Sequence, residues 1–160
     1  MTTTADLGTE REQAETANRI FFRLYQAANL MHKTGTRALE DHGVTTQQWA
    51  VIGALSRPQA EQGMMVGDLA RFLMVSRQNL SLVVARLEAQ AYLERLRDKD
   101  DGRSRRIRLS AAGRKLWKRI TPTIYRYYED ALAGLTPDEK IALAALFARL
   151  IGNMSRLDRE

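Results

Sequence analysis

The stretch Ser76–Leu109, SRQNLSLVVARLEAQAYLERLRDKDDGRSRRIRL, changes the period of its apolar residues partway along. Up to Gln90 the apolar side chains recur every three or four residues, as they do on one face of a helix. From Tyr92 onward two segments alternate apolar and charged residues, as strands do, and a charged turn that contains Gly102 separates them. The stretch therefore predicts a helix capped by Ser76, followed by a β-hairpin.

A long first helix is expected over residues 12–41. Two neighbouring apolar stripes run through this segment with spacings of three and four residues. Gly43 follows directly and suits a C-terminal cap. The Thr, Ala, Asp and Gly content of residues 1–11 predicts a disordered N-terminal tail.

Two shorter helices are expected between this segment and Ser76. Thr45 and Gln48 form a capping-box pattern that starts the second helix, and Pro58 ends it. The third helix is expected over residues 67–73, where three apolar residues share one face. A tight turn then leads into the helix that Ser76 caps.

Two long helices are expected after the hairpin. Ser110 caps the first of them, Pro122 lies inside it and is expected to kink it, and Gly134 ends it. The segment Thr136–Glu139 combines a cap, a proline at the first position and an acidic first turn, and it starts the last helix, which reaches Leu157. The order of elements predicts a mainly α protein with a small β-hairpin wing, a winged helix-turn-helix.

Positive charge is concentrated in the middle of the chain. The formal net charge is +6, yet residues 71–119 contain 14 Lys or Arg and only 5 Asp or Glu. A basic segment between mildly acidic ends is typical of a nucleic-acid-binding surface. A solvated charged face is the alternative.

The predicted helix that starts at Ser76 has the composition of a DNA-reading helix. In a winged helix-turn-helix this helix enters the major groove and the hairpin forms the wing. Arg pairs with guanine edges, and Gln or Asn with adenine edges. The candidate base-reading residues are Ser76, Arg77, Gln78, Asn79, Ser81 and Arg86. The candidate wing-tip residues, suited to phosphates or the minor groove, are Arg103, Arg105 and Arg106.

Other classes of protein find little support in the sequence. The chain has no cysteine and only two histidines, His32 and His42, and it has no glycine-rich phosphate loop and no metal-ligand spacing. Neighbouring Lys and Arg oppose a cation site in the acidic segment 98–101. We therefore expect no enzyme, cofactor or metal site. A helical protein-binding adaptor without DNA function is the remaining alternative, although it would gain nothing from the Arg-rich hairpin.

The location expected for the chain is the cytoplasm. No apolar run approaches the roughly 18 residues of a membrane span, and the N-terminus lacks the basic and apolar regions of a signal peptide.

The segment Asp101–Gly113 resembles the wing signature of the MarR family, which reads Asp-x-Arg, six residues, then Leu-Ser/Thr-x-x-Gly. Upstream, Leu69-Ala70, Val75–Gln78 and Leu87-Glu88 resemble the helix-turn-helix of that family. The six-helix order matches as well, and the resemblance covers residues 12–157. Two departures are Met65-Val66, where the family often has a Ser or Thr cap, and Gln90-Ala91, where it often has Gly.

The resemblance implies a homodimer on a pseudo-palindromic operator. Residues 12–44 and 111–160 would form a helical dimerisation region, and residues 45–110 would form the DNA-binding region. In the family, Asp101 would make a salt bridge within the wing while Arg103 enters the minor groove. Effectors of the family commonly bind between the dimer core and the winged domain.

The effector expected in that crevice is an aromatic acid or its coenzyme A thioester, acting as the inducer that releases a repressor. The polar and aromatic residues expected to line the crevice are Phe22, Tyr25, Asn29, His32, Trp49, Tyr125 and Tyr128. Basic pairs spaced by four residues, suited to phosphates at its mouth, are Arg19 with Arg23 and Lys33 with Arg37. The alternatives are that these residues are only core or solvated surface, and that the effector is non-aromatic or absent.

Overall fold

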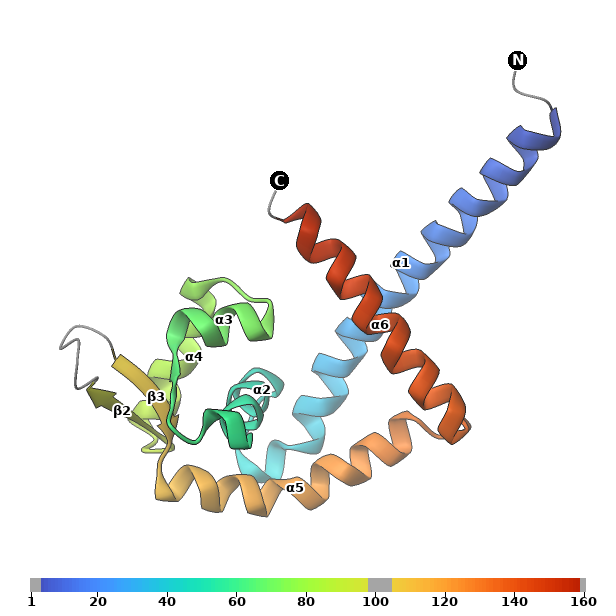
Figure 1. The fold of residues 1–160 in the computed structure, drawn as a ribbon. Coiled ribbons are helices and arrows are strands. Elements are labelled where there is room, and N and C mark those ends of the chain that lie inside the picture. Colours follow the sequence, from blue (N-terminus) through green and yellow to red (C-terminus); the bar gives the residue numbers. More distant parts are fainter. Residues whose placement is uncertain (1–3, 98–104, 159–160) are drawn as a thin grey trace. The chain divides into compact units, whose positions relative to one another are not determined.

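The computed structural model describes residues 4–97 and 105–158, with side chains described for residues 10–96 and 106–158. The fold is mostly helical and includes one small sheet (Figure 1). The six α-helices and the hairpin follow one another in the order expected from the sequence. The helices are α1 (Thr4–Ala38), α2 (Thr46–Leu55), α3 (Val66–Leu73), α4 (Arg77–Ala89), α5 (Ala111–Ala131) and α6 (Pro137–Leu157). The strands are β1 (Met64–Met65), β2 (Leu93–Arg97) and β3 (Arg105–Leu109), and short 3₁₀ helices η1 (Glu40–His42) and η2 (Pro58–Ala60) lie in the connections.

The chain divides into two compact units, Met1–Thr123 and Ile124–Glu160. The boundary falls inside α5, between Thr123 and Ile124 and one residue past Pro122, the proline expected within this helix. This compact division differs from the expected division into a dimerisation region and a DNA-binding region, which groups segments by their partners and stays a prediction. No helix in the described part of the chain is long and apolar enough to cross a membrane.

The first helix starts earlier than its apolar stripes predicted. It begins at Thr4 and not at Glu12, so residues 4–11, expected as a disordered tail, continue the helix. Glu10 and Arg11 are good helix formers, and Arg11 donates from Nε to Glu15 Oε1 across 3.2 Å, one turn further on. The periodicity argument missed this segment because it carries no apolar stripe.

The core of the N-terminal unit lies where α2, α3 and α4 meet the sheet. The most completely buried large side chains include Ile52, Leu69, Leu80, Leu87 and Ile107, one or more from each of these elements. Burying a side chain of this size contributes about 1.5–3 kcal/mol. The apolar faces expected for the second, third and fourth helices are confirmed, and they hold α3 and α4 in the helix-turn-helix arrangement.

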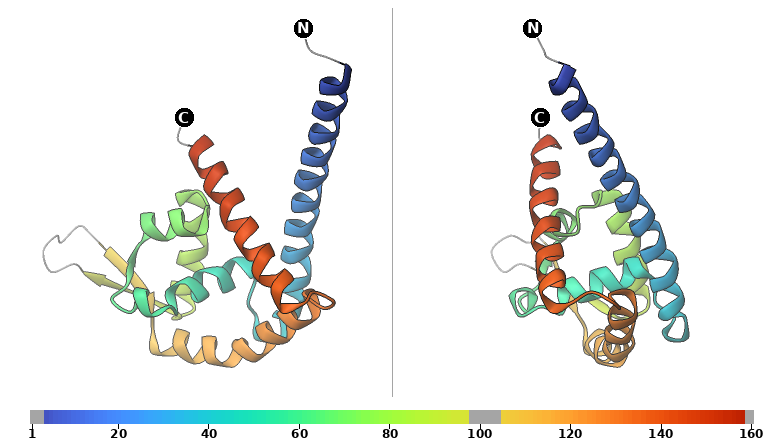
Figure 2. Two further views of the ribbon diagram at one scale, coloured as in Figure 1. Left: turned by 45° about the vertical axis from the view of Figure 1, so that its right-hand side comes forward. Right: turned by 90° about the vertical axis from the view of Figure 1, so that its right-hand side faces the viewer.

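The hairpin is confirmed, and a third strand joins it. Strands β2 and β3 lie side by side as a hairpin (Figures 1 and 2). The sheet has the antiparallel order β1-β3-β2, with Leu93 opposite Leu109 and Met64 opposite Ile107. Strand β1 was not predicted, because a two-residue strand has too few positions to show alternation. It ties the start of α3 to the base of the hairpin.

Helix ends largely follow the expected caps. Thr45 and Thr136 each form a complete capping box, with Gln48 and Glu139 respectively. Gly43 adopts φ +65° after η1, the left-handed conformation that favours glycine. Met65, in contrast, makes no side-chain cap bond, so α3 has a weak start at the position where the family often has a Ser or Thr cap.

The end of α4 is the second weak terminus. Ala91 adopts φ +58° just past the helix, in the left-handed region where a Cβ atom is crowded. This is the place where the family pattern often has glycine. Its backbone N–H still closes the helix by donating to the carbonyl of Glu88 across 2.9 Å.

Gly113 allows the start of α5 to pack against Tyr92, the residue just before β2. A Cβ atom at this position would lie 2.1 Å from the carbonyl oxygen of Tyr92, far inside any real contact. The Ser110 hydroxyl accepts a hydrogen bond from the Gly113 N–H at 3.0 Å, which confirms Ser110 as the cap of this helix. The last glycine of the wing signature therefore has a packing role.

Candidate nucleic-acid interface

The outward face of α4 carries the candidate base-reading side chains. Ser76 caps the helix by accepting a hydrogen bond from the backbone N–H of Asn79 at 3.2 Å. Leu80, Val84 and Leu87 form the buried face, so Gln78 and Asn79 project from the exposed side near the N-terminus. Arg86, also exposed, lies two turns after Asn79 on the same side of the helix.

Two of the predicted base-reading residues, Arg77 and Ser81, are exposed but make contacts within the protein. The guanidinium of Arg77 lies over Gly67 at the start of α3, because a Cβ atom at Gly67 would be only 3.1 Å from Arg77 Nη2. The hydroxyl of Ser81 donates to the carbonyl oxygen of Arg77 across 2.7 Å. The sequence could not reveal these contacts, since the first depends on how α3 packs against α4.

Leu82 stands on the outward face and was missed by the sequence reasoning. It is 60% exposed, although it is a large apolar residue in the middle of α4. A helical projection would have found it, because Leu82 lies one turn after Gln78 and one turn before Arg86. The search for polar side chains passed over it.

Two arginines of the hairpin form ion pairs. Arg95 donates to both carboxylate oxygens of Glu88 on α4, at 2.5 and 2.8 Å, and Arg108 donates to Glu94 on the neighbouring strand at 2.6 Å. The hydrogen bonds that Arg95 donates to Glu88 raise the pKa of Arg95 above its ordinary value. These two ion pairs fix the base of the wing against α4 and within the sheet.

The arginines predicted at the wing tip occupy different places. Arg105, expected in the turn, is the first residue of β3 and pairs with Arg97. Arg106 lies in the body of the sheet opposite Leu96 and is half-buried; its Nε has no hydrogen-bond partner among the described residues. Arg103 and Asp101, the residues implied for the minor groove and the wing salt bridge, lie outside the described residues.

Most of the predicted effector residues are exposed on α1. Arg19 donates to the hydroxyl of Thr16 at 3.1 Å and Arg23 to the side-chain oxygen of Gln26 at 3.2 Å. His32 hydrogen-bonds through Nδ1 to Thr46 Oγ1 at 2.9 Å, which links α1 to the first turn of α2. The other exposed residues of this group on α1 are Phe22, Tyr25, Asn29, Lys33 and Arg37.

The remaining predicted effector residues lie on two other helices. Trp49 is half-buried in α2 of the N-terminal unit. Tyr125 and Tyr128 belong to the C-terminal unit, where their ring centroids lie 6.4 Å apart in a tilted arrangement. Partial burial raises the pKa of the Tyr128 phenol above its ordinary value.

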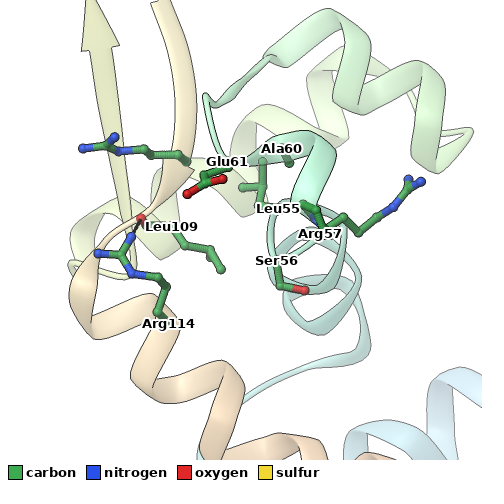
Figure 3. Close-up of a pocket in the computed structure, with 9 residues that line it drawn as sticks. Leu55, Ser56, Arg57, Ala60, Glu61, Leu109 and Arg114 are labelled. Atoms are coloured by element: carbon green, nitrogen blue, oxygen red, sulfur yellow. Dashed lines mark hydrogen bonds between the residues drawn. The ribbon is translucent and has the colours of Figure 1, made fainter.

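A pocket of about 550 Å³ opens elsewhere, between the end of α2, η2, β3 and the start of α5 (Figure 3). Arg114 lies at its edge and donates to the Leu109 carbonyl at 2.7 Å, while Glu61 contributes a carboxylate. Arg57 points away from the pocket (Figure 3), and its guanidinium carbon Cζ lies 4.5 Å from the centroid of the Phe72 ring. None of the predicted effector residues lines this pocket.

The outward face of α4 carries groups of the kind that pair with base edges. Among the described residues, no group of three or more His, Asp or Glu is placed to hold a metal ion. Amide groups at Gln78 and Asn79 match base edges, and a cation at Arg86 accompanies them. The hairpin beside α4 adds further cations.

The sequence and the structure both match known transcriptional regulators. The sequence model of the MarR family matches residues 42–104. The transcriptional activatory protein BadR of Rhodopseudomonas palustris is 48% identical over 145 residues, which cover 90% of this chain and 83% of BadR.

Solved structures agree with this assignment. The Staphylococcus aureus MepR–DNA complex matches with a TM-score of 0.73 at 20% identity, over 83% of this chain and 94% of MepR. The PcaV regulator of Streptomyces coelicolor, in complex with its natural ligand, matches with a TM-score of 0.67 at 26% identity, over 79% and 89% of the two chains. These relatives are regulators and not enzymes. The chain has their winged helix-turn-helix fold and, as the resemblance implied, belongs to the MarR family of DNA-binding transcriptional regulators.

Proposed function

We propose that this regulator binds a pseudo-palindromic operator as a homodimer, with α4 in the major groove and the hairpin wing beside it, and that a small effector controls binding. The observation that carries the proposal is the outward face of α4. Gln78 and Asn79 project from its N-terminal turn, next to an Arg-rich hairpin. A dimer places two such faces about one helical turn of DNA apart.

Exposed apolar surface supports the homodimer. None of the described side chains of α6 is buried, although the helix is rich in Leu, Ile and Phe. Large apolar side chains are also exposed along α1, including Ile20, Phe21 and Met31. A second copy of the chain would cover both rows.

The effector we propose is an aromatic acid or its coenzyme A thioester. Tyr25 offers an exposed aromatic ring beside the amide of Asn29 on α1. Arg19, Arg23, Lys33 and Arg37 all lie on one face of the same helix, because their spacings of 4, 10 and 4 residues fit the helical repeat. Such a cationic row suits the phosphates of a thioester. The solved complex of PcaV with its natural ligand supports a ligand-controlled regulator.

The direction of control has two candidates. Repression is the first candidate. The effector would then release the repressor from DNA by binding the DNA-free state more tightly than the DNA-bound state, because a ligand shifts a population only through its differential affinity for the two states. Activation is the second candidate, because the 48% identical relative from Rhodopseudomonas palustris is named an activatory protein. Transcription in vitro from a template that carries the operator separates the two: repression predicts less transcript with the protein present, and activation predicts more.

Salt-dependent binding to duplex DNA tests the DNA-binding mode. We expect Arg103→Ala to weaken binding to all sequences and to lower the slope of log K against log salt by about one. Gln78→Ala should change base preference while leaving that slope intact. Lys140→Ala, which removes a charge from α6, is the matched control and should change neither. An unchanged affinity and slope for Arg103→Ala would refute the wing assignment.

Calorimetry with benzoate, 4-hydroxycinnamate and their coenzyme A thioesters tests the effector. We expect binding tighter than roughly 100 μM, which corresponds to about −5.5 kcal/mol. Tyr25→Ala and His32→Ala should weaken it, whereas Arg114→Ala in the separate pocket should not. If none of the four compounds binds, the proposal of an aromatic effector is wrong, whereas the proposal of DNA binding stands. Loss of binding in Arg114→Ala alone would move the effector to that other pocket.

A further inference from the structure

Leu82 occupies the centre of the face that α4 would present to DNA. It lies one turn after Gln78 and one turn before Arg86, and it is 60% exposed. A single exposed leucine on a protein surface is ordinary. This one, however, lies between an amide and a cation on the helix that would read the bases.

The polar groups around Leu82 are directed elsewhere. The hydroxyl of Ser81 donates to the carbonyl of Arg77 at 2.7 Å. The guanidinium of Arg77 lies over Gly67 and not over the outward face. The centre of the face is therefore apolar, with hydrogen-bonding groups only at its N-terminal end and at Arg86.

The residues that follow Leu82 on α4 are small enough to allow the helix to approach DNA closely. Ala85 and Ala89 follow it along the outermost line of the helix, and both are exposed. Short side chains there allow the helix backbone to lie deep in a groove, and that depth brings Leu82 to the base edges. A long polar residue at either position would hold the helix away.

We propose that Leu82 contacts the C5-methyl group of a thymine and makes an A·T pair at that place in each half-site a determinant of operator specificity. The proposal rests on the proposed function only in placing α4 in the major groove. The thymine methyl is the one apolar group that a base pair presents there. Guanine and adenine edges, and the amino group of cytosine, would lose hydrogen bonds to water against a leucine side chain.

Methyl deletion on the DNA tests this contact. The probe is a duplex selected by the wild-type protein from a random-sequence library, in which each thymine is replaced singly by deoxyuridine. For the wild type we expect one thymine in each half-site whose replacement weakens binding about fourfold, the factor that corresponds to about 0.8 kcal/mol for one buried methyl group. Anisotropy titrations measure the dissociation constants.

Variants of the protein assign the effect to Leu82. Leu82→Ala should bind thymine and uracil duplexes equally, while Leu82→Met, which keeps an apolar tip, should retain discrimination. Lys140→Ala, an exposed residue of α6, is the control and should discriminate as the wild type does. Circular dichroism establishes that each variant is folded.

Four results would overturn the proposal. One is a wild type that is insensitive to every thymine replacement. Another is a Leu82→Ala variant with the full wild-type discrimination. The third is a wild type that binds bulk DNA with a normal salt slope but selects no sequence, which would overturn specific reading by Leu82 and leave groove binding intact. Absence of DNA binding even at low salt would overturn the proposed function as well.

Discussion

The side-chain amide of Gln48 donates from Nε2 to Oε1 of Gln90 across 3.2 Å, and so joins the first turn of α2 to the C-terminal cap of α4. The other end of the same amide is also occupied, because Oε1 of Gln48 accepts the backbone N–H of Thr45 at 3.0 Å. Gln48 is only 8% exposed and, with Thr46, is one of the buried polar residues of the described chain. One side chain thus caps α2 and fixes the end of the proposed reading helix.

We predict that Gln48→Leu lowers the free energy of unfolding by about 1–3 kcal/mol. The substitution keeps the apolar volume but removes the cap and leaves the Gln90 amide and the Thr45 N–H without this partner. Urea denaturation measures the change. Gln47→Leu, on the exposed neighbour, is the matched control and should cost less than about 0.5 kcal/mol. Equal effects of the two substitutions would show that the link to Gln90 contributes nothing.

We predict that Ala91→Gly stabilises the protein by about 1 kcal/mol. Ala91 adopts φ +58°, and an L-residue there costs roughly 1–2 kcal/mol that glycine does not incur. The greater freedom of glycine in the unfolded chain offsets part of the gain. Ala89→Gly, inside the last turn of α4, is the control and should destabilise by about 0.5–1 kcal/mol. A loss of stability in Ala91→Gly would mean that this residue is not left-handed in solution.

We predict that the cap of α6 weakens in acid. The backbone N–H of Thr136 and then its hydroxyl donate to Glu139 Oε2, at 2.8 and 3.0 Å, and lower the pKa of this carboxyl below its ordinary value of 4.5. A carboxyl whose folded pKa is lowered stabilises the fold above its unfolded pKa, and the stabilisation disappears as the pH falls through the folded pKa. The effect is therefore expected below pH 4.5.

Thermal melts of the wild type and Glu139→Gln between about pH 6 and pH 3 measure this effect, because the other carboxyls titrate in both proteins and cancel in the difference. The wild type should melt higher than the variant at pH 6, and the difference should shrink below pH 4.5. A difference that does not change with pH would contradict the role of the ionised Glu139.

Local patterns predicted most of the fold. The caps at Thr45 and Thr136 and the alternation of Leu93–Arg97 are encoded in neighbouring residues, so the sequence alone located these elements. Strand β1 escaped because Met64 and Met65 become a strand only through β3, which lies far along the chain. The start of α1 escaped because its first turns have no apolar face.

The candidate site was predicted less completely than the fold. Residue type placed Gln78 and Asn79 on the reading helix, and both project outward. The packing of α3 against α4 decides that Arg77 lies over Gly67, and no local pattern records such a contact. Leu82 was missed for a different reason: the candidate base-reading residues were all polar, and Leu82 is apolar.

We predict that the folded protein is a dimer at micromolar concentration and that Leu146→Glu disrupts it. Leu146 is 58% exposed in the single chain, on a face of α6 that also carries Leu143, Phe147 and Met154. A carboxylate buried at such an interface without a partner costs several kcal/mol, so the dimer dissociation constant should rise at least about a hundredfold. Ala145→Glu places the same charge on the opposite side of the helix and should leave the dimer intact. Sedimentation velocity with circular dichroism at each concentration is the measurement, and a wild type that sediments as a folded 18.2 kDa species would refute the prediction.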